Sequence, residues 1–231
     1  MEYTQNCIIC NLKIIMISAI ILAAGLSTRF SNKIPKQFSI LSNKKSVLDF
    51  SINTFISNNK INEIIIVVPK IWKNKIQKKY PNLKIVCGGK NRSESSYLGL
   101  QKCSRKCKFV LIHDAARPLI SQSIINKCIT QLLHYDAVIP CLNIYDSIIA
   151  INEKRINYLD RKNIKLVQTP QAFKYDKILS SYSNATNELD DFSVLVKNSN
   201  KIKKIFIDGC NKNFKITTED DMIIARKIID E

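Results

Sequence analysis

The sequence is poor in acidic residues and contains no long uninterrupted apolar run. Nineteen Asp and Glu stand against 36 Lys and Arg, which gives a formal net charge of +17. Such a surplus predicts attraction to polyanions, whether nucleotides, phosphorylated metabolites or nucleic acid. The lysines are spread over nearly every segment, however, which favours compositional drift over a nucleic-acid-binding face. Charged or polar residues interrupt each apolar segment before it reaches membrane-spanning length, so we expect no membrane association.

Several common site signatures are also missing. The sequence has neither the P-loop pattern G-x-x-x-x-G-K-[ST] nor the dinucleotide pattern G-x-G-x-x-G. Cys7 and Cys10 have the spacing of zinc ligands, but no second pair or nearby His completes a tetrahedral site. Several of the other cysteines lie in apolar segments, where a thiol acts as a small hydrophobic group. We therefore expect reduced cysteines and a cytoplasmic location.

The chain length of 231 residues favours one α/β domain of generous size. Residues 1–15 show little pattern, and Met16 stands directly before the first apolar run. We interpret residues 1–15 as an N-terminal extension outside the fold, and residues 16–231 as a single domain. No internal repeat, low-complexity segment or linker divides it.

Strand and helix patterns alternate along most of the chain, which predicts a three-layer α/β domain with a largely parallel sheet. The expected strands are 17–22, 63–69, 83–87, 109–113, 137–140, 166–173 and 204–208. The expected helices are 47–55 with Ser46 as N-cap, 71–80, one after the glycine pair at 88–89, 121–135, 175–183, one opened by Asp190 and Asp191, and a final helix capped by Thr217 or Thr218. The acid pair is interpreted as helix capping.

Residues 142–165 interrupt this alternation. Two short apolar pieces, 148–151 and 156–159, flank a polar turn and predict a hairpin arm. A two-stranded arm buries too little to stay folded alone. We expect it to pack on the body or on another subunit.

The first strand is followed by the feature that points most directly to a ligand. Ala23, Ala24 and Gly25 are small, so the backbone can approach a ligand and its N–H groups can bind an anion. Arg29 and Lys36 then place two cations on one loop, with Pro35 before the lysine. This layout is expected around a nucleotide triphosphate, and the alternative is a basic surface loop.

Two later strand ends are polar as well. Gly88 and Gly89 lead into a helix whose first turn contains Arg92 and is rich in serine, and such helix starts attract anions. The strand 109–113 ends at His113 and Asp114, at the edge where α/β folds bind ligands. The alternatives are a simply capped helix and a local ion pair of Asp114 with Arg117 that closes a turn. His113 is interpreted as a satisfied strand-end residue.

Six motifs in order resemble one family. The segments are Leu22-Ala23-Ala24-Gly25-x-Ser27-x-Arg29, Pro35-Lys36-Gln37, Gly88-Gly89-x-x-Arg92-x-x-Ser95, His113-Asp114-Ala115-Ala116-Arg117-Pro118, Gln168-Thr169-Pro170-Gln171-x-Phe173 and Asn213-x-Lys215-Ile216-Thr217. From residue 17 to the C-terminus they resemble the 2-C-methyl-D-erythritol 4-phosphate cytidylyltransferases of the non-mevalonate isoprenoid pathway.

The resemblance implies a Rossmann-like nucleotidyltransferase that joins CTP to methylerythritol phosphate, releases pyrophosphate, needs Mg²⁺ and works as a homodimer. It implies that Arg29, Lys36 and Lys215 are catalytic cations, with Mg²⁺ on the triphosphate. The implied nucleotide-binding residues are Ala23, Ala24, Gly25, Gly88, Arg92 and Ser95. The implied acceptor-binding residues are Asp114, Arg117, Arg161 and Thr169, with the arm at 142–165 crossing to the partner so that Arg161 and Thr169 reach the acceptor phosphate in the other subunit's site.

The sequence departs from the family pattern at three positions. Ser27 replaces a glycine, Leu189 replaces the usual threonine before the acid pair, and Ile149 replaces a lysine of the arm. These changes bear on the acceptor more than on the reaction. A ribitol 5-phosphate cytidylyltransferase is therefore the nearest alternative. A basic nucleic-acid-binding protein is less favoured, because aromatic residues are not interleaved with the basic ones, and an inactive relative is disfavoured because the phosphate-site positions keep Arg or Lys.

Overall fold

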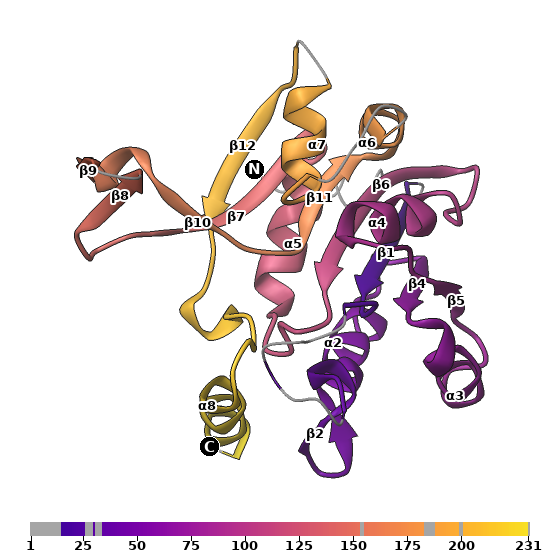
Figure 1. The fold of residues 1–231 in the computed structure, drawn as a ribbon. Helices are drawn as coiled ribbons and strands as arrows, with labels where there is room; N and C mark the ends of the chain where they lie inside the picture. The colour runs from indigo at the N-terminus through magenta and orange to yellow at the C-terminus, as the bar shows by residue number, and fades with distance from the viewer. Residues whose placement is uncertain are drawn as a thin grey trace, which may run out of the picture.

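The structure is a computed structural model that describes residues 15–25, 30, 34–152, 155–182, 188–198 and 201–230. Within them, eight strands form one central sheet (Figure 1). Their bounds are β1 Met16–Leu22, β4 Glu63–Val68, β5 Lys84–Cys87, β6 Cys107–Asp114, β7 Ala137–Asn143, β10 Lys165–Val167, β11 Gln171–Lys174 and β12 Lys204–Asp208. The strand order is β10-β7-β11-β6-β1-β4-β5, and β12 pairs with β7.

The sheet is mostly parallel. Strand β1 lies parallel to both β6 and β4, β4 lies parallel to β5, and β12 lies parallel to β7. Strand β11 runs antiparallel between β6 and β7, and β10 runs antiparallel to β7. The predicted α/β architecture is confirmed.

Helices cover both faces of the sheet, and β1 shows how the sequence produces this. Ile17, Ala19 and Ile21 pack on one face, whereas Ile20 packs on the other, because successive side chains of a strand alternate. The first face is covered by α2 (Val47–Ile56), α3 (Lys73–Lys79) and α5 (Gln122–Gln131). The second is covered by α4 (Arg92–Leu100), α6 (Tyr175–Ser181) and α7 (Asp191–Lys197).

A small hairpin and the last helix form a separate cluster that the sequence did not predict. Strands β2 (Ile40–Ser42) and β3 (Lys45–Ser46) pair antiparallel, and Leu41 packs with Ile216 and with α8 (Glu219–Asp230). Asn43 and Lys44 form the turn with φ of 47° and 58°. Two-residue hairpin turns usually contain glycine, and because this one does not, the sequence did not indicate a hairpin here.

The predicted helix ends need several corrections. Ser46 caps α2 as expected, in a capping box with Asp49. The helix expected at 121–135 ends at Gln131, where Leu132 is the C-cap. The helix expected at 71–80 is a 3₁₀ turn, η2 (Lys70–Trp72), followed by α3. The strand expected at 137–140 extends to Asn143.

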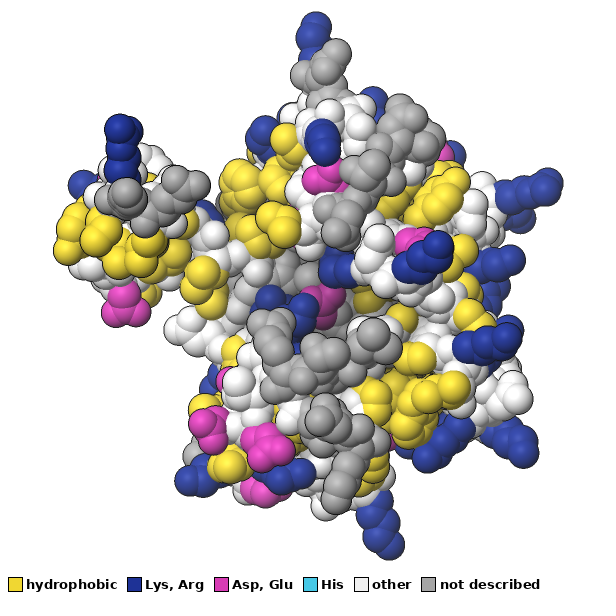
Figure 2. Space-filling view, viewed as in Figure 1, with side chains coloured by type: hydrophobic (Ala, Val, Ile, Leu, Met, Phe, Trp, Pro, Cys, Tyr) yellow, Lys and Arg dark blue, Asp and Glu magenta, His cyan; other side chains and the backbone are white. Residues whose placement is uncertain are grey.

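The predicted arm is confirmed as a hairpin of β8 (Ile148–Asn152) and β9 (Arg155–Leu159) that projects from the body (Figure 1). Its apolar side chains are exposed: Tyr158 is 80% exposed, Ile151 66% and Ile156 65%. They form the hydrophobic patch on the projecting lobe in Figure 2. Across the described part of the chain, none of the helices combines the length and apolarity needed to cross a membrane.

Candidate active site

A cleft of about 630 Å³ opens where β1 and β6 end at their carboxyl edges. In Figure 2 it is the central hollow in which basic and acidic side chains meet. This is the edge at which open α/β sheets bind ligands. Four parts of the chain far apart in sequence contribute to its lining: Ala23, Ala24, Gly25, Phe30, Lys36 and Gln37; Gly89, Lys90, Asn91, Arg92 and Ser95; Asp114 and Ala116; Lys215 and Thr217.

The small-residue turn after β1 is fixed by a buried amide. The Nε2 atom of Gln37 donates to the carbonyl oxygens of Ala23 (2.8 Å) and Gly25 (2.7 Å). Gln37 follows Lys36 in the 3₁₀ turn η1 (Lys36–Phe38), so one turn positions both the lysine and the backbone loop. Phe38 of the same turn stacks on Trp72 with ring centroids 4.0 Å apart.

The glycine pair allows the second loop to lie against the first. A Cβ added to Gly88 would lie 2.2 Å from the Cβ of Ala24, a steric clash that would force one of the two loops to shift. The Oγ atom of Ser95 accepts from the N–H of Gly89 (3.1 Å) and donates to the carbonyl of Asn91 (2.8 Å). Ser95 thus closes the loop onto α4, whose N-cap is Asn91.

Asp114 is held between two cations. Its Oδ1 lies 3.2 Å from the Nη2 of Arg92, and its Oδ2 accepts from the Nζ of Lys215 at 2.7 Å. Burial raises the pKa of the Asp114 carboxyl, but Arg92 and Lys215 outweigh it and hold that pKa well below its ordinary value. The alternative of a local Asp114–Arg117 ion pair is wrong, because the Arg117 guanidinium donates to the carbonyls of Asn213 and Val167 while the Asp114 carboxylate contacts Arg92 and Lys215.

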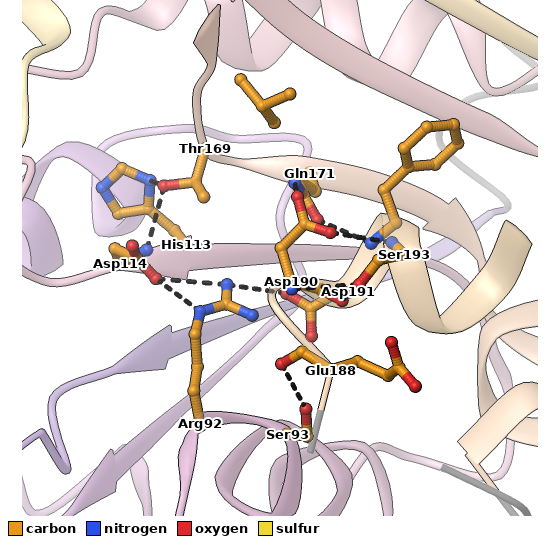
Figure 3. Close-up of polar contacts among 12 residues, drawn as sticks. Arg92, Ser93, His113, Asp114, Thr169, Gln171, Glu188, Asp190, Asp191 and Ser193 are labelled. Atoms are coloured by element: carbon orange, nitrogen blue, oxygen red, sulfur yellow. Dashed lines mark hydrogen bonds and ion pairs between the residues drawn. The ribbon is translucent and has the colours of Figure 1, made fainter. Parts of the chain in front are cut away.

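Arg92 has a second carboxylate partner, Asp191 (Figure 3). Its Nη2 lies 2.8 Å from the Oδ2 of Asp191, which is completely buried. Burial lowers the pKa of Arg92, but the charges of Asp191 and Asp114 outweigh this and raise it. The capping interpretation therefore holds for Asp190, the N-cap of α7, and was incomplete for Asp191.

His113 is a structural residue, as predicted, and Thr169 shares its hydrogen bonds. The Nε2 of His113 contacts the carbonyl of Arg117 (3.1 Å), and its Nδ1 contacts the Oγ1 of Thr169 (3.1 Å). That Oγ1 also accepts from the N–H of Asp114 (3.0 Å). Burial lowers the pKa of His113 to about 4, so the ring is neutral at pH 7. Neither ring nitrogen is available to take a proton from a ligand.

The segment that carries Lys215 is anchored by buried amides. Gln168 donates from Nε2 to the carbonyl of Cys210 (2.9 Å), and its Oε1 accepts from the N–H of Cys210 (3.1 Å). Asn213 donates from Nδ2 to the carbonyl of Thr169 (2.8 Å). Arg117 donates from Nη1 to the carbonyl of Asn213 (2.8 Å). Arg117 thus supports the segment from behind the cleft wall.

Those predicted site residues that the structure describes fall into three groups. Eight line the cleft: Ala23, Ala24, Gly25, Lys36, Arg92, Ser95, Asp114 and Lys215. Gly88, Arg117 and Thr169 pack behind its wall instead. Arg161, in the exposed turn η3 (Arg161–Asn163) of the arm, donates to the carbonyl of Tyr145 away from the cleft. Arg29 lies outside the described residues, as does Ser27.

Sequence reasoning gave no role to Gln37 and missed the ion pair of Asp191. The sequence feature that could have indicated a role for Gln37 is its place in Pro35-Lys36-Gln37, directly after the lysine. The feature that could have indicated a role for Asp191 is that an N-cap needs only one acidic residue, whereas the sequence has two. Leu189, the departure noted before this pair, is 91% exposed. The site as a whole can position an anion beside fixed cations.

Comparisons with known proteins agree with this geometry. Residues 17–231 match the family model described as IspD: 2-C-methyl-D-erythritol 4-phosphate cytidylyltransferase. The enzyme of that name from Caldicellulosiruptor bescii is 35% identical over 222 residues, which cover 92% of this chain and 97% of the relative. A bifunctional IspD/IspF enzyme from Pelagibacter ubique is 39% identical over 206 residues, or 88% of this chain, but the chain spans only 55% of it.

A solved structure shares the fold over nearly the whole chain. The 4-diphosphocytidyl-2C-methyl-D-erythritol synthase of Anaerococcus prevotii superposes with a TM-score of 0.83 at 27% identity, covering 96% of this chain and 99% of that structure. The segments that line the cleft, from Ala23 to Lys215, belong to the motifs on which the sequence resemblance was based. The chain belongs to the 2-C-methyl-D-erythritol 4-phosphate cytidylyltransferase family.

Proposed function

We propose that the protein transfers the cytidylyl group of CTP to 2-C-methyl-D-erythritol 4-phosphate, giving 4-diphosphocytidyl-2-C-methyl-D-erythritol and pyrophosphate for isoprenoid precursor synthesis. The observation that carries the proposal is one cleft shared by the small-residue loop at Ala23 to Gly25 and by the cations of Lys36 and Lys215. A backbone loop and separated cations suit a triphosphate and a second phosphate.

The reaction needs charge neutralisation rather than a general base. A phosphate oxygen of the acceptor, already ionised near neutral pH, attacks the α-phosphorus of CTP in line, and pyrophosphate leaves with the electron pair of the broken bond. Catalysis then consists of holding two anions together and stabilising charge in the transition state. Lys36 and Lys215 line the cleft as point charges. Arg29 is the third cation that the family pattern assigns.

We propose that Mg²⁺ enters with the triphosphate and neutralises part of its charge. Among the described residues, no cluster of three His, Cys, Asp or Glu side chains could hold a metal ion. The cleft carboxylate of Asp114 already contacts Arg92 and Lys215. Phosphate oxygens and water are therefore the main ligands in this proposal, as is common for Mg²⁺.

We also propose a cytoplasmic homodimer with shared active sites. The exposed apolar side chains of the arm support it, because a lone hairpin with such a surface needs a partner. Arg161 would then reach the acceptor phosphate in the partner's cleft. Unpaired thiols among the described cysteines, Cys87, Cys103, Cys107, Cys128, Cys141 and Cys210, are compatible with a reducing compartment.

The test is pyrophosphate release with CTP and Mg²⁺, offering methylerythritol phosphate and ribitol 5-phosphate in parallel. We expect turnover with methylerythritol phosphate and CTP, and much less with ATP or GTP. Preference for ribitol 5-phosphate would assign the other acceptor. Equal use of all nucleotides would contradict a cytidine pocket.

A further inference from the structure

Four charged side chains of alternating sign form a continuous chain from the protein interior to the cleft. They are Asp191, Arg92, Asp114 and Lys215, joined by contacts of 2.8 Å, 3.2 Å and 2.7 Å. Figure 3 shows the Arg92 guanidinium between the two carboxylates. The formal charges of the four groups sum to zero.

Arg92 is the residue of this chain of charges whose contacts differ most from those expected of a phosphate-binding arginine. Its side chain lines the cleft proposed for the triphosphate, yet both carboxylates draw its guanidinium away from a phosphate. Its Nη1 is buried without a hydrogen-bond partner among the described residues. A guanidinium binds phosphate strongly through two parallel donors. A triphosphate in the cleft would therefore compete with Asp114 for the guanidinium of Arg92.

Asp191 suits this role because it is buried and one of its carboxylate oxygens is held by a hydrogen bond. It is 0% exposed, and its Oδ1 accepts from the hydroxyl of Tyr182 at 2.6 Å. The start of α7 is held by Gln171, which donates to the Oδ2 of Asp190 (2.7 Å) and accepts from the N–H of Phe192 (2.9 Å). The hydrogen bond from Tyr182 and the anchored start of α7 thus oppose a movement of the Asp191 carboxylate towards the cleft.

We propose that Asp191 is a positioning residue whose buried charge keeps Arg92 on Asp114 and off the phosphates, so that Asp114 in turn holds Lys215 at the cleft. The inference rests on the proposed function. It assigns Asp191 no contact with substrate. Its effect passes through two ion pairs, and its loss leaves one uncompensated positive charge at the cleft wall.

The experiment measures the affinity of the protein for Mg²⁺-pyrophosphate by calorimetry, beside steady-state turnover. In Asp191→Asn the amide is nearly isosteric, and its oxygen still accepts from Tyr182. Freed from its buried partner, Arg92 binds phosphate, so pyrophosphate should bind on the order of tenfold more tightly while kcat falls by about the same factor. A purely structural defect would not tighten the binding of an anion.

Two further variants isolate the cause. Asp176→Asn removes one negative charge from the exposed first turn of the neighbouring helix α6, so pyrophosphate affinity should stay within about twofold of the wild type. Arg92→Gln/Asp191→Asn restores neutrality, so its pyrophosphate affinity should return to within about twofold, while kcat stays low because Asp114 has lost its guanidinium.

The outcomes separate the inference from the proposed function. A wild-type protein that binds no pyrophosphate contradicts the proposed function, and the inference with it. Wild-type affinity and turnover in Asp191→Asn, with pyrophosphate binding intact, overturn the inference alone. If Asp191→Asn fails to fold, the double variant decides, and unchanged turnover in it would equally overturn the role of Asp191.

Discussion

The Nζ of Lys215 donates to the Oδ2 of Asp114 at 2.7 Å, although 101 residues separate the two in sequence. The ammonium is only partly buried, with 38% of its side chain exposed, and the carboxylate is almost enclosed. Asp114 therefore fixes the direction of Lys215 at the cleft while leaving donors for a ligand. A phosphate that binds Lys215 meets a cation already in place, which lowers the reorganisation needed during the reaction.

The first prediction concerns stability and pH. Asp114→Asn should destabilise the fold by about 3 kcal/mol at pH 7, because it leaves Arg92 and Lys215 with less compensation. The pKa of Asp114 in the folded state lies below its ordinary value of 3.8. Its contribution is therefore fully present above that value and is lost as the pH falls towards the folded-state pKa.

Urea unfolding of the wild type and Asp114→Asn between pH 7 and pH 3 measures this effect. The difference in unfolding free energy should be constant above about pH 5 and shrink below about pH 4. A difference that grows on acidification would mean that Asp114 is not stabilised as a carboxylate.

The second prediction concerns Lys36. Lys36→Ala should lower kcat by ~10²–10³ and weaken CTP binding less, because its ammonium neutralises charge that builds on the phosphates in the transition state. Lys36→Arg should recover only part of the rate, since a planar fork cannot occupy a point-charge position. Steady-state kinetics and a thermal melt test this, with the exposed Lys70→Ala as control. Unchanged turnover, or a large fall in melting temperature, would assign Lys36 another role.

The third prediction concerns the contact between the two loops. Gly88→Ala should lower the melting temperature and the affinity for CTP, because its methyl group would lie 2.2 Å from the Cβ of Ala24 and push the first loop aside. Gly25→Ala is the control for the melt, since a Cβ there meets no atom within 4 Å. Equal melting temperatures for the two variants would contradict the packing argument.

The fourth prediction tests the shared site. Lys36→Ala and Arg161→Ala should each be inactive as purified dimers and regain roughly a quarter of wild-type activity when subunits are exchanged, because half the dimers are mixed and each has one intact site. Sedimentation of the wild type provides the control. A fully active monomer, or no recovery in proven mixed dimers, would contradict the role of the arm.

The sequence predicted the layers and most of the cleft because each depends on local patterns. Alternation in β1 and the small residues after it are visible without any partner. The hairpin β2–β3 was missed because the turn residues Asn43 and Lys44 lack the glycine that marks such turns.

The contacts among distant charges could not be predicted in the same way. Whether Asp114 pairs with Arg117, three residues away, or with Lys215 depends on where the segment after β12 passes the end of β6. Asp191 and Gln37 are polar residues that become buried only in the folded chain, and their partners lie on other elements. Spacing along the sequence carries no information on such partners.

In the proposed reaction an oxygen of the acceptor phosphate attacks the α-phosphorus of CTP. The most direct measurement uses methylerythritol phosphate labelled with ¹⁸O in its phosphate group, followed by mass spectrometry of both products. We expect all label in the cytidylyl product, with one labelled oxygen bridging its two phosphorus atoms, and none in pyrophosphate. Label in pyrophosphate, or CMP formed in place of the cytidylyl product, would contradict it.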